Sequence, residues 1–333
     1  MDSLSQIALG SAVAIGVMGR RTAVRKSAAW GAVAGTLPDL DVVIDHGDAL
    51  LNMVLHRGES HALLYLTLFA PLMAWGVARL HGEAALFRRW WLALWLVLVT
   101  HPLLDAMTVY GTQLLLPFTR HPFGVGSVFI IDPAYTLPLI AGVLVALCGR
   151  EGARGLRWNL AGLVLSTAYL GWSVLAQSHA EQMARVSLQT QGVAAERVLV
   201  TPLPLQTLLW RVVALPDDPK DPQFREAVVS VFDGARPVDW TAYPRGSALM
   251  AQHGQAAPVA RLTAFTHGFV KLAATPDGQL RITDLRMGQE PAYVFNFDLG
   301  PLDAVGSVPA TQVSARPAIG PTLRWMWQRL SSP

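Results

Sequence analysis

The feature that most constrains this chain is a set of four apolar runs in its first half, at residues 62–80, 90–110, 133–149 and 158–177. A helix needs about 20 apolar residues to cross the roughly 30 Å hydrocarbon core of a bilayer. The first and last runs match that length, the run at 90–110 contains His101 and Asp105, and the run at 133–149 is short. We therefore expect an α-helical multi-pass membrane domain over residues 1–178. The alternative is a soluble protein with buried helices.

Two weaker apolar segments precede these runs, at residues 3–18 and 27–44. Both are rich in Gly and Ala and are short for a full span. We interpret them as a helical hairpin that either spans the membrane or inserts partly. A cleavable signal peptide is not expected, because the chain starts Met-Asp and lacks a basic region before the first apolar segment.

Charge is scarce, at 15% of residues, whereas a typical soluble domain carries about 25%. If the apolar segments alternate in direction, ten of the twelve basic residues in this half fall on one side: Arg20, Arg21, Arg25, Lys26, Arg79, Arg88, Arg89, Arg150, Arg154 and Arg157. The positive-inside rule places that side in the cytoplasm. Most acids and everything after residue 178 then lie outside. The sequence thus predicts a membrane protein with an extracytoplasmic domain at residues 179–333.

The remaining composition excludes several classes of protein. The net charge of +3 comes from scattered bases that form no stripe, so no nucleic-acid partner is expected. The single cysteine, Cys148, excludes a disulfide framework. The expected partner is the lipid bilayer, and the oligomeric state is left open.

His101 and Asp105 are the most unusual residues of the apolar half. A spacing of four places both side chains on one face of a helix. Ionisable groups inside a membrane helix are costly and usually belong to a functional site or an internal pair. The alternatives are that the two residues only pair with each other, or that Pro102 interrupts the helix locally.

Other Asp and His residues are predicted at the same depth and on the same outer side. Aspartates on turns also act as helix caps, and loop histidines are often ordinary, so each residue alone leaves that alternative open. Imidazole and carboxylate together are ligands of zinc, manganese or iron. We therefore predict one to three divalent ions, with zinc as the expected metal and manganese or iron as alternatives. The candidate ligands are Asp2, Asp39, Asp41, His56, His61, His101 and Asp105, with Asp132 as a further candidate or a helix cap.

Several segments resemble one bacterial family. Met1–Gln6 (MDSLSQ), Gly35–Asp41 (GTLPDLD), His56–His61 (HRGESH), His101–Asp105 (HPLLD) and Tyr110–Thr112 (YGT) resemble the membrane-bound metal-dependent hydrolases typified by YdjM. Thr201–Val213 and Asp284–Gly288 look like the C-terminal part of the longer members. The family usually has Thr where Ser60 stands. More remotely, the His/Asp arrangement resembles the zinc-dependent phospholipase C and P1-nuclease group.

The resemblance implies an inner-membrane protein with His56, His61, His101 and Asp105 as ligands and Asp39 and Asp41 beside them. One member is named for binding the LexA repressor. We expect a hydrolase in which a metal-activated water attacks a phosphoester of a lipid or envelope component, a role that a metal site can serve. Glu59 is the candidate general base. Arg57 and Arg120 lie on the predicted outer side, whereas the other basic residues of this half lie inside, and arginine suits a phosphate.

Two other functions are kept as alternatives. The first is a non-catalytic membrane regulator or scaffold with a structural metal site. The second is a transporter, which the position of the polar residues at one membrane edge disfavours.

The second half reads as a small α+β domain. Residues 178–200 are interpreted as an amphipathic helix, residues 207–215 and 225–234 as strands with a turn region at 217–222, and residues 257–265 as a short helix. Residues 269–287 form the clearest hairpin, with a Pro-Asp-Gly turn between two β-rich runs. A further strand is expected at 292–299. Trp325 and Trp327 suit either a membrane interface or the packing of a terminal helix.

Overall fold

The computed structural model describes residues 1–149, 152–216, 222–234, 236–315 and 319–331. The chain forms two compact units, each described here by itself. The first contains residues 1–43, 57–173 and 204–206, and the second contains residues 44–56, 174–203 and 207–333. The expected turn region at 217–222 lies almost entirely outside the described residues.

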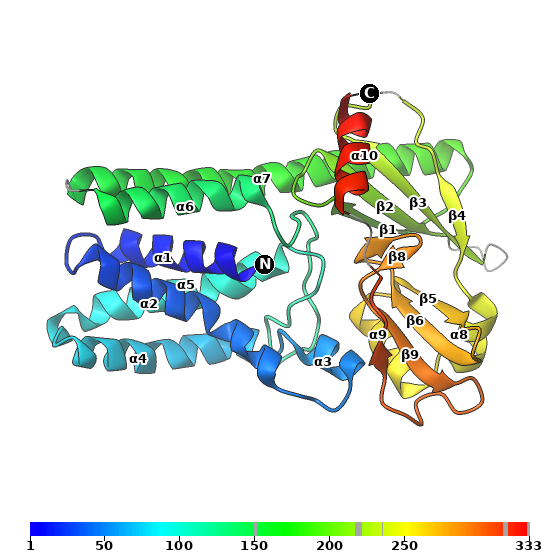
Figure 1. The fold of residues 1–333 in the computed structure, drawn as a ribbon, viewed down its shortest axis with the longest axis horizontal. Helices are drawn as coiled ribbons and strands as arrows, with labels where there is room; N and C mark the ends of the chain where they lie inside the picture. The colour runs from blue at the N-terminus through cyan, green and yellow to red at the C-terminus, as the bar shows by residue number, and fades with distance from the viewer. Residues whose placement is uncertain (150–151, 217–221, 235, 316–318, 332–333) are drawn as a thin grey trace. The chain divides into compact units, whose positions relative to one another are not determined.

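The first unit is a bundle of helices (Figure 1). Its long helices are α1 (Ser3–Met18), α2 (Val24–Thr36), α4 (Leu63–Leu80), α5 (Phe87–Ala106), α6 (Pro133–Cys148) and the first part of α7 (Gly152–Thr190). Three short 3-10 segments join them: η1 (Pro38–Val43), η2 (Glu59–His61) and η3 (Ala84–Leu86). Each apolar run of the sequence therefore forms a helix, and residues 3–18 and 24–36 form the expected hairpin.

Small residues bring the two hairpin helices into close contact. A methyl group on Gly31 would lie 2.3 Å from the carbonyl oxygen of Gly10 and 2.8 Å from Cβ of Ala14. No side chain fits at these distances, so glycine is required where α1 and α2 cross. Ser11 also donates a hydrogen bond to the Ala28 carbonyl across the pair. This packing places the start of α1 beside the end of α2.

Two of the described helices are long and apolar enough to cross a membrane, namely α4 and residues 154–190 of α7. Only 28% of each apolar window is buried inside the protein, unlike the core helix of a soluble domain. Leu68, Leu72 and Trp75 of α4 are among the exposed side chains. The helix α6 is apolar but shorter, at 16 residues. The multi-pass arrangement stays a prediction.

The second unit contains two antiparallel four-stranded sheets. The first is a meander in the order β1 (Arg197–Pro202), β2 (Leu209–Leu215), β3 (Gln223–Ser230) and β4 (Thr241–Pro244). The second has the order β10 (Thr311–Gln312), β9 (Asn296–Pro301), β6 (Gln279–Asp284) and β5 (Val270–Ala274). A two-stranded ribbon joins β7 (Gly288–Gln289) to β8 (Ala292–Tyr293), and the helices are α3 (Ala49–Leu55), α8 (Ser247–His253), α9 (Ala257–Phe265) and α10 (Ile319–Ser331).

The expected hairpin and short helix of this half are present as β5–β6 and α9, and the strands expected at 207–215 and 225–234 as β2 and β3. The single strand expected at 292–299 is instead divided between β8 and β9, which belong to different sheets. The helix expected at residues 178–200 is different. It is the continuation of α7, which ends at Thr190, and β1 occupies residues 197–202. The alanines Ala176, Ala180 and Ala184 recur every four residues and pack with Trp210 and Val229 in the core of the first sheet. That buried stripe keeps α7 helical beyond its apolar part.

Candidate metal centre

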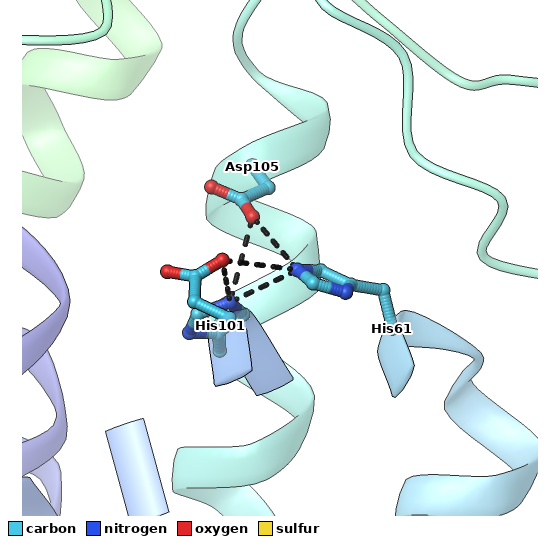
Figure 2. Close-up of side chains that lie close together, drawn as sticks. His61, His101 and Asp105 are labelled. Carbon is cyan, nitrogen blue, oxygen red and sulfur yellow. Dashed lines mark hydrogen bonds and ion pairs between the residues drawn. The ribbon is translucent and has the colours of Figure 1, made fainter. Parts of the chain in front are cut away.

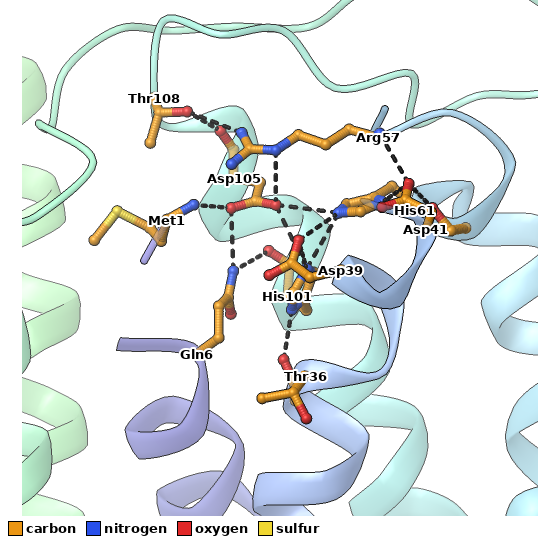
Figure 3. A network of polar contacts seen from close by, with 12 residues as sticks. Met1, Gln6, Thr36, Asp39, Asp41, Arg57, His61, His101, Asp105 and Thr108 are labelled. Carbon is orange, nitrogen blue, oxygen red and sulfur yellow. Dashed lines mark hydrogen bonds and ion pairs between the residues drawn. The ribbon is translucent and has the colours of Figure 1, made fainter. Parts of the chain in front are cut away.

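Four side chains from three segments converge at one end of the helical unit. His101 and Asp105 lie one turn apart on α5, His61 ends η2, and Asp39 lies in η1 (Figures 2 and 3). Their four donor atoms all lie within 4.8 Å of one another. The side chains of His61, His101 and Asp105 are fully buried, whereas that of Asp39 is 24% exposed. The group could therefore hold a cation that is reached past Asp39.

The distances between the donor atoms are those of a small tetrahedron. Nε2 of His61 lies 3.2 Å from Nε2 of His101, 3.2 Å from Oδ2 of Asp105 and 3.4 Å from Oδ1 of Asp39. Nε2 of His101 lies 3.5 Å from each of the same two carboxylate oxygens. Tetrahedral zinc with nitrogen and oxygen ligands at about 2.0–2.1 Å requires edges of about 3.3–3.4 Å. These five distances are close to such edges, and the sixth pair, the carboxylate oxygens of Asp39 and Asp105, lies within 4.8 Å.

The proton on His101 can be placed from its other ring nitrogen. Nδ1 lies 2.7 Å from the carbonyl oxygen of Gly35, at the end of α2. A carbonyl oxygen only accepts, so Nδ1 carries the proton and donates it. In the neutral ring, Nε2 therefore presents a lone pair to the centre. A histidine that ligates a metal is commonly oriented by such a bond.

A relay of two side chains places the proton on His61. The Ser60 hydroxyl lies 2.5 Å from Oδ2 of Asp41 and donates its single hydrogen to that carboxylate. The same Ser60 oxygen lies 2.8 Å from Nδ1 of His61, so it accepts from the ring. Nε2 of neutral His61 thus also presents a lone pair. In these tautomers two imidazole lone pairs and two carboxylate oxygens face one point, an arrangement that a cation between them would stabilise.

Among the four candidate ligands, Asp105 has the most supporting contacts. Its Oδ1 accepts hydrogen bonds from the Met1 amino group and from Nε2 of Gln6, the latter at 3.1 Å. Its Oδ2 is buried and accepts no hydrogen bond in the described part of the chain. Nε of Arg57 lies 3.3 Å from that oxygen as an ion pair. Oδ2 is therefore available to a cation.

The electrostatics of the surrounding groups favour ionised carboxylates. Burial raises the pKa of Asp39, but the neighbouring His101 and His61 side chains outweigh it and hold the pKa well below its ordinary value. Burial and the positive charge of Arg57 lower the pKa of the Met1 amino group, against the opposing effect of Asp105. The centre thus carries negative charge that a divalent ion would neutralise.

Arg57 is buried beside the metal group. It is 3% exposed and lies over the Tyr110 ring at 4.8 Å, with Nη1 donating to the Thr108 hydroxyl at 3.2 Å. Its backbone has a positive φ of 62°. The bond from its N–H to Asp41 at 3.1 Å helps to hold that conformation. Arg57 therefore supports Asp105, which is a different role from binding a phosphate at the surface.

Three predicted ligands lie outside the group of four. Asp2 caps α1, accepting from the backbone of Leu4 and Ser5, because its position before the helix suits its short carboxylate. Asp41 is engaged by Ser60 and Arg57 and acts behind His61. His56 is the C-cap of α3, in the segment that belongs to the second unit.

The other site predictions are placed as follows. Asp132 caps α6 and accepts from the Tyr169 hydroxyl at 2.8 Å. Glu59 is exposed at the start of η2, and Arg120 is exposed in the loop after α5.

Sequence reasoning missed the supporting residues Gln6, Ser60 and Thr108 and the Gly35 carbonyl. The signals were present for three of them, because Gln6, Gly35 and Ser60 stand inside the motifs that carry the resemblance. Nothing in the sequence shows which oxygen of a carboxylate they contact.

The comparisons with known proteins agree with the helical half of the chain. No solved structure matches, so the remote resemblance to zinc phospholipases stays an expectation. The uncharacterized protein YfhP of Bacillus subtilis (strain 168) is 27% identical over 169 residues, which are 49% of this chain and 50% of the relative. The chain thus spans about half the length of that curated relative. Residues 1–180, more than half of the chain and including the entire metal group, match the family described as YdjM inner membrane protein. The chain belongs to this family of inner membrane proteins.

Proposed function

We propose that this protein is a membrane-bound metal-dependent hydrolase that acts on a phosphoester of a lipid or envelope component. The observation that carries the proposal is the convergence of four potential donor atoms from Asp39, His61, His101 and Asp105. Two nitrogens and two oxygens in a small tetrahedron suit zinc, with manganese or iron as alternatives. A bound divalent ion supplies a Lewis acid and lowers the pKa of water.

The exposure of the ligands favours a site that substrate can enter. His61, His101 and Asp105 form a buried set of three, and Asp39 is the partly exposed fourth. Catalytic zinc typically has three protein ligands and one position open to water or substrate. We propose that Asp39 stands at the open side and holds the attacking water. Glu59 stays the candidate general base that the sequence suggests, from its exposed position two residues before His61.

The charge distribution supports an extracytoplasmic position for the centre. Four of the bases that the positive-inside rule assigns to the cytoplasm, Arg20, Arg21, Arg25 and Lys26, lie between α1 and α2 or in the first turn of α2, whereas Asp39 follows the opposite end of α2. The proposed substrate is then a phosphoester that faces the periplasm.

A metal analysis and an activity assay on one set of variants test the proposal. We expect purified wild-type protein to contain about one zinc, manganese or iron per chain, the ratio that one group of four ligands implies. His101→Ala should lose the metal, whereas His121→Ala, a histidine outside the group, should keep it. Hydrolysis of phospholipids should stop on chelation and return on reloading. Native protein without any bound metal would refute the proposal.

Two further variants separate the candidate base from the ligands. Glu59→Gln should keep the metal and lower the turnover number about 10²–10⁴-fold if its carboxylate takes the proton. Asp39→Asn should impair turnover more than metal content, because three buried ligands remain. Equal loss of metal in Asp39→Asn and His101→Ala would contradict an open position at Asp39.

A structural metal site in a non-catalytic regulator is the second candidate. It is favoured by the fact that four protein donors already complete a tetrahedron, as in structural zinc sites. In that case chelation should lower the unfolding temperature of the protein, and no phosphoester should be cleaved by the loaded form. The transporter alternative has no specific support, since the group lies at one end of the helices.

A further inference from the structure

We propose that the metal centre is bordered by two apolar loop tips that insert into the lipid bilayer. The first tip is formed by Leu40, Val42 and Val43 of η1, and the second by Leu115 and Phe118 of the loop at residues 112–123. This lipid-binding surface does not require hydrolytic activity, so its test is independent of the proposed function.

The η1 tip is exposed although its neighbours are held in the metal centre. Asp39 faces the centre, and Asp41 accepts hydrogen bonds from Ser60 and from the Arg57 backbone. The residues between and after them point away, and Val43 is 80% exposed. Exposure of these branched apolar side chains to water does not stabilise the folded protein. A solvent-exposed apolar cluster next to a polar site marks an interaction surface.

The second tip projects from a firmly held base. Thr112 and Phe123 form a backbone pair, with hydrogen bonds of 2.8 and 2.9 Å in the two directions. Between them, the Phe118 N–H donates to the Leu115 carbonyl at 2.8 Å and closes a turn. Phe118 is 80% exposed at that turn. The turn therefore holds an aromatic ring out of the protein.

Backbone hydrogen bonds connect the two tips through the segment that carries His61. The Arg57 N–H donates to Asp41 of η1, and the Arg57 carbonyl accepts from the Gln113 N–H at 3.0 Å. The Leu63 N–H donates to the Leu114 carbonyl at 3.0 Å, where α4 begins. Both tips thus connect to the segment that carries His61, at the same end of the helical unit as the metal centre.

Three observations identify the occupant as lipid. The chain belongs to an inner-membrane family, and all of these residues lie within the matching range. The exposed apolar face of the candidate span α4 starts at Leu64, directly beside the second tip, and continues through Leu68 and Leu72. Arg120 is exposed two residues after Phe118. An aromatic ring followed by a basic group suits the boundary between acyl chains and headgroups.

Site-directed fluorescence in bilayers tests the proposal. Cys148 is the single cysteine, so Cys148→Ser provides a background without thiols. On this background, Val43→Cys and Phe118→Cys each carry an environment-sensitive label at a highly exposed position. Leu72→Cys on α4 and Asp277→Cys in the turn between β5 and β6 serve as lipid-facing and water-facing references. The full chain is reconstituted in nanodiscs with either ordinary or brominated phospholipids.

We expect brominated lipid to quench both tip labels, with a loss of fluorescence comparable to that at Leu72 and well above that at Asp277. Iodide in the buffer should quench the Asp277 label and spare the tips. The proposal would be overturned if brominated lipid left the label at Val43 or the label at Phe118 unquenched. Tips protected from both quenchers would also overturn it, because a protein surface would then cover them.

Discussion

Ser60 gives the sharpest test of how the metal centre is organised. Ser60→Ala removes the oxygen that accepts from Nδ1 of His61 and donates to Asp41. None of the four donor atoms is changed. Without its partner, the His61 ring can turn or move its proton to Nε2, and either change takes the lone pair away from the centre. Ser60→Thr keeps the hydroxyl and is the residue usual in the family, so it is the matched control.

The expected loss follows from the bonds that Ser60 makes. Hydrogen bonds to a charged carboxylate contribute about 1.5–3 kcal/mol, and neutral ones about 0.5–1.5 kcal/mol. Of this free energy, only the contribution that orients the His61 ring affects metal binding. Removing partners of ligating histidines typically weakens metal binding about 10–100-fold. That range corresponds to about 1.4–2.7 kcal/mol, which agrees with the loss of one to two such bonds.

A competition titration against a chromophoric zinc chelator measures the effect in purified protein. We expect Ser60→Ala to raise the zinc dissociation constant about 10–100-fold and Ser60→Thr to leave it close to the wild-type value. The secondary structure of each variant is compared by circular dichroism. An unchanged dissociation constant in folded Ser60→Ala would refute the relay from Asp41 to His61.

Three further predictions concern ligand charge, helix packing and the far end of the bundle. Asp105→Asn should abolish metal binding and lower the free energy of unfolding by about 3–5 kcal/mol, because Arg57 then stays buried without its counter-charge; metal retention equal to that of Asp132→Asn would contradict this. Gly31→Ala should destabilise the protein by about 1–3 kcal/mol through overlap with the Gly10 backbone, whereas Gly76→Ala, with no atom within 4 Å, should not; equal unfolding midpoints would disprove the close crossing. Burial raises the pKa of Glu83, but hydrogen bonds from Lys26, Thr22 and Trp90 outweigh it, so the net pKa is lowered. Glu83 then stabilises the fold above its ordinary pKa of 4.5, and this stability is lost as the pH falls through the lower folded value. Glu83→Gln should flatten that acid dependence in unfolding titrations while zinc binding stays intact; the same slope in both proteins would argue against the ion pair.

The helical elements were predictable because each depends on local composition. The apolar runs at 62–80 and 133–149 appear as α4 and α6 with nearly the predicted limits. The end of α7 was not predictable in this way. Its alanine stripe is buried by Trp210, which lies 20 or more residues further along the chain, so the helix continues where local polarity suggested a separate element.

The sequence predicted which residue types form the candidate site, but only some of the residues that converge there. The spacing of His101 and Asp105 places both on one face of α5, since the helical repeat is a local property. Asp39 and Asp41 are two residues apart, and because both are aspartates, residue type does not show which of them faces the metal group. The structure directs Asp39 to the centre and Asp41 to Ser60, because a 3-10 segment turns successive side chains in different directions.

The order of residues along the chain was sufficient to indicate a membrane-associated helical half, the end at which its acids and histidines gather, and a metal as their common partner. These conclusions depend on hydrophobicity, periodicity and charge, which are properties of neighbouring residues. The assignment of the four donor atoms, the proton positions on the two imidazoles and the supporting role of Arg57 required the tertiary structure. Each depends on atoms that are brought within a few ångströms from segments up to 66 residues apart, as in the bond between His101 and Gly35.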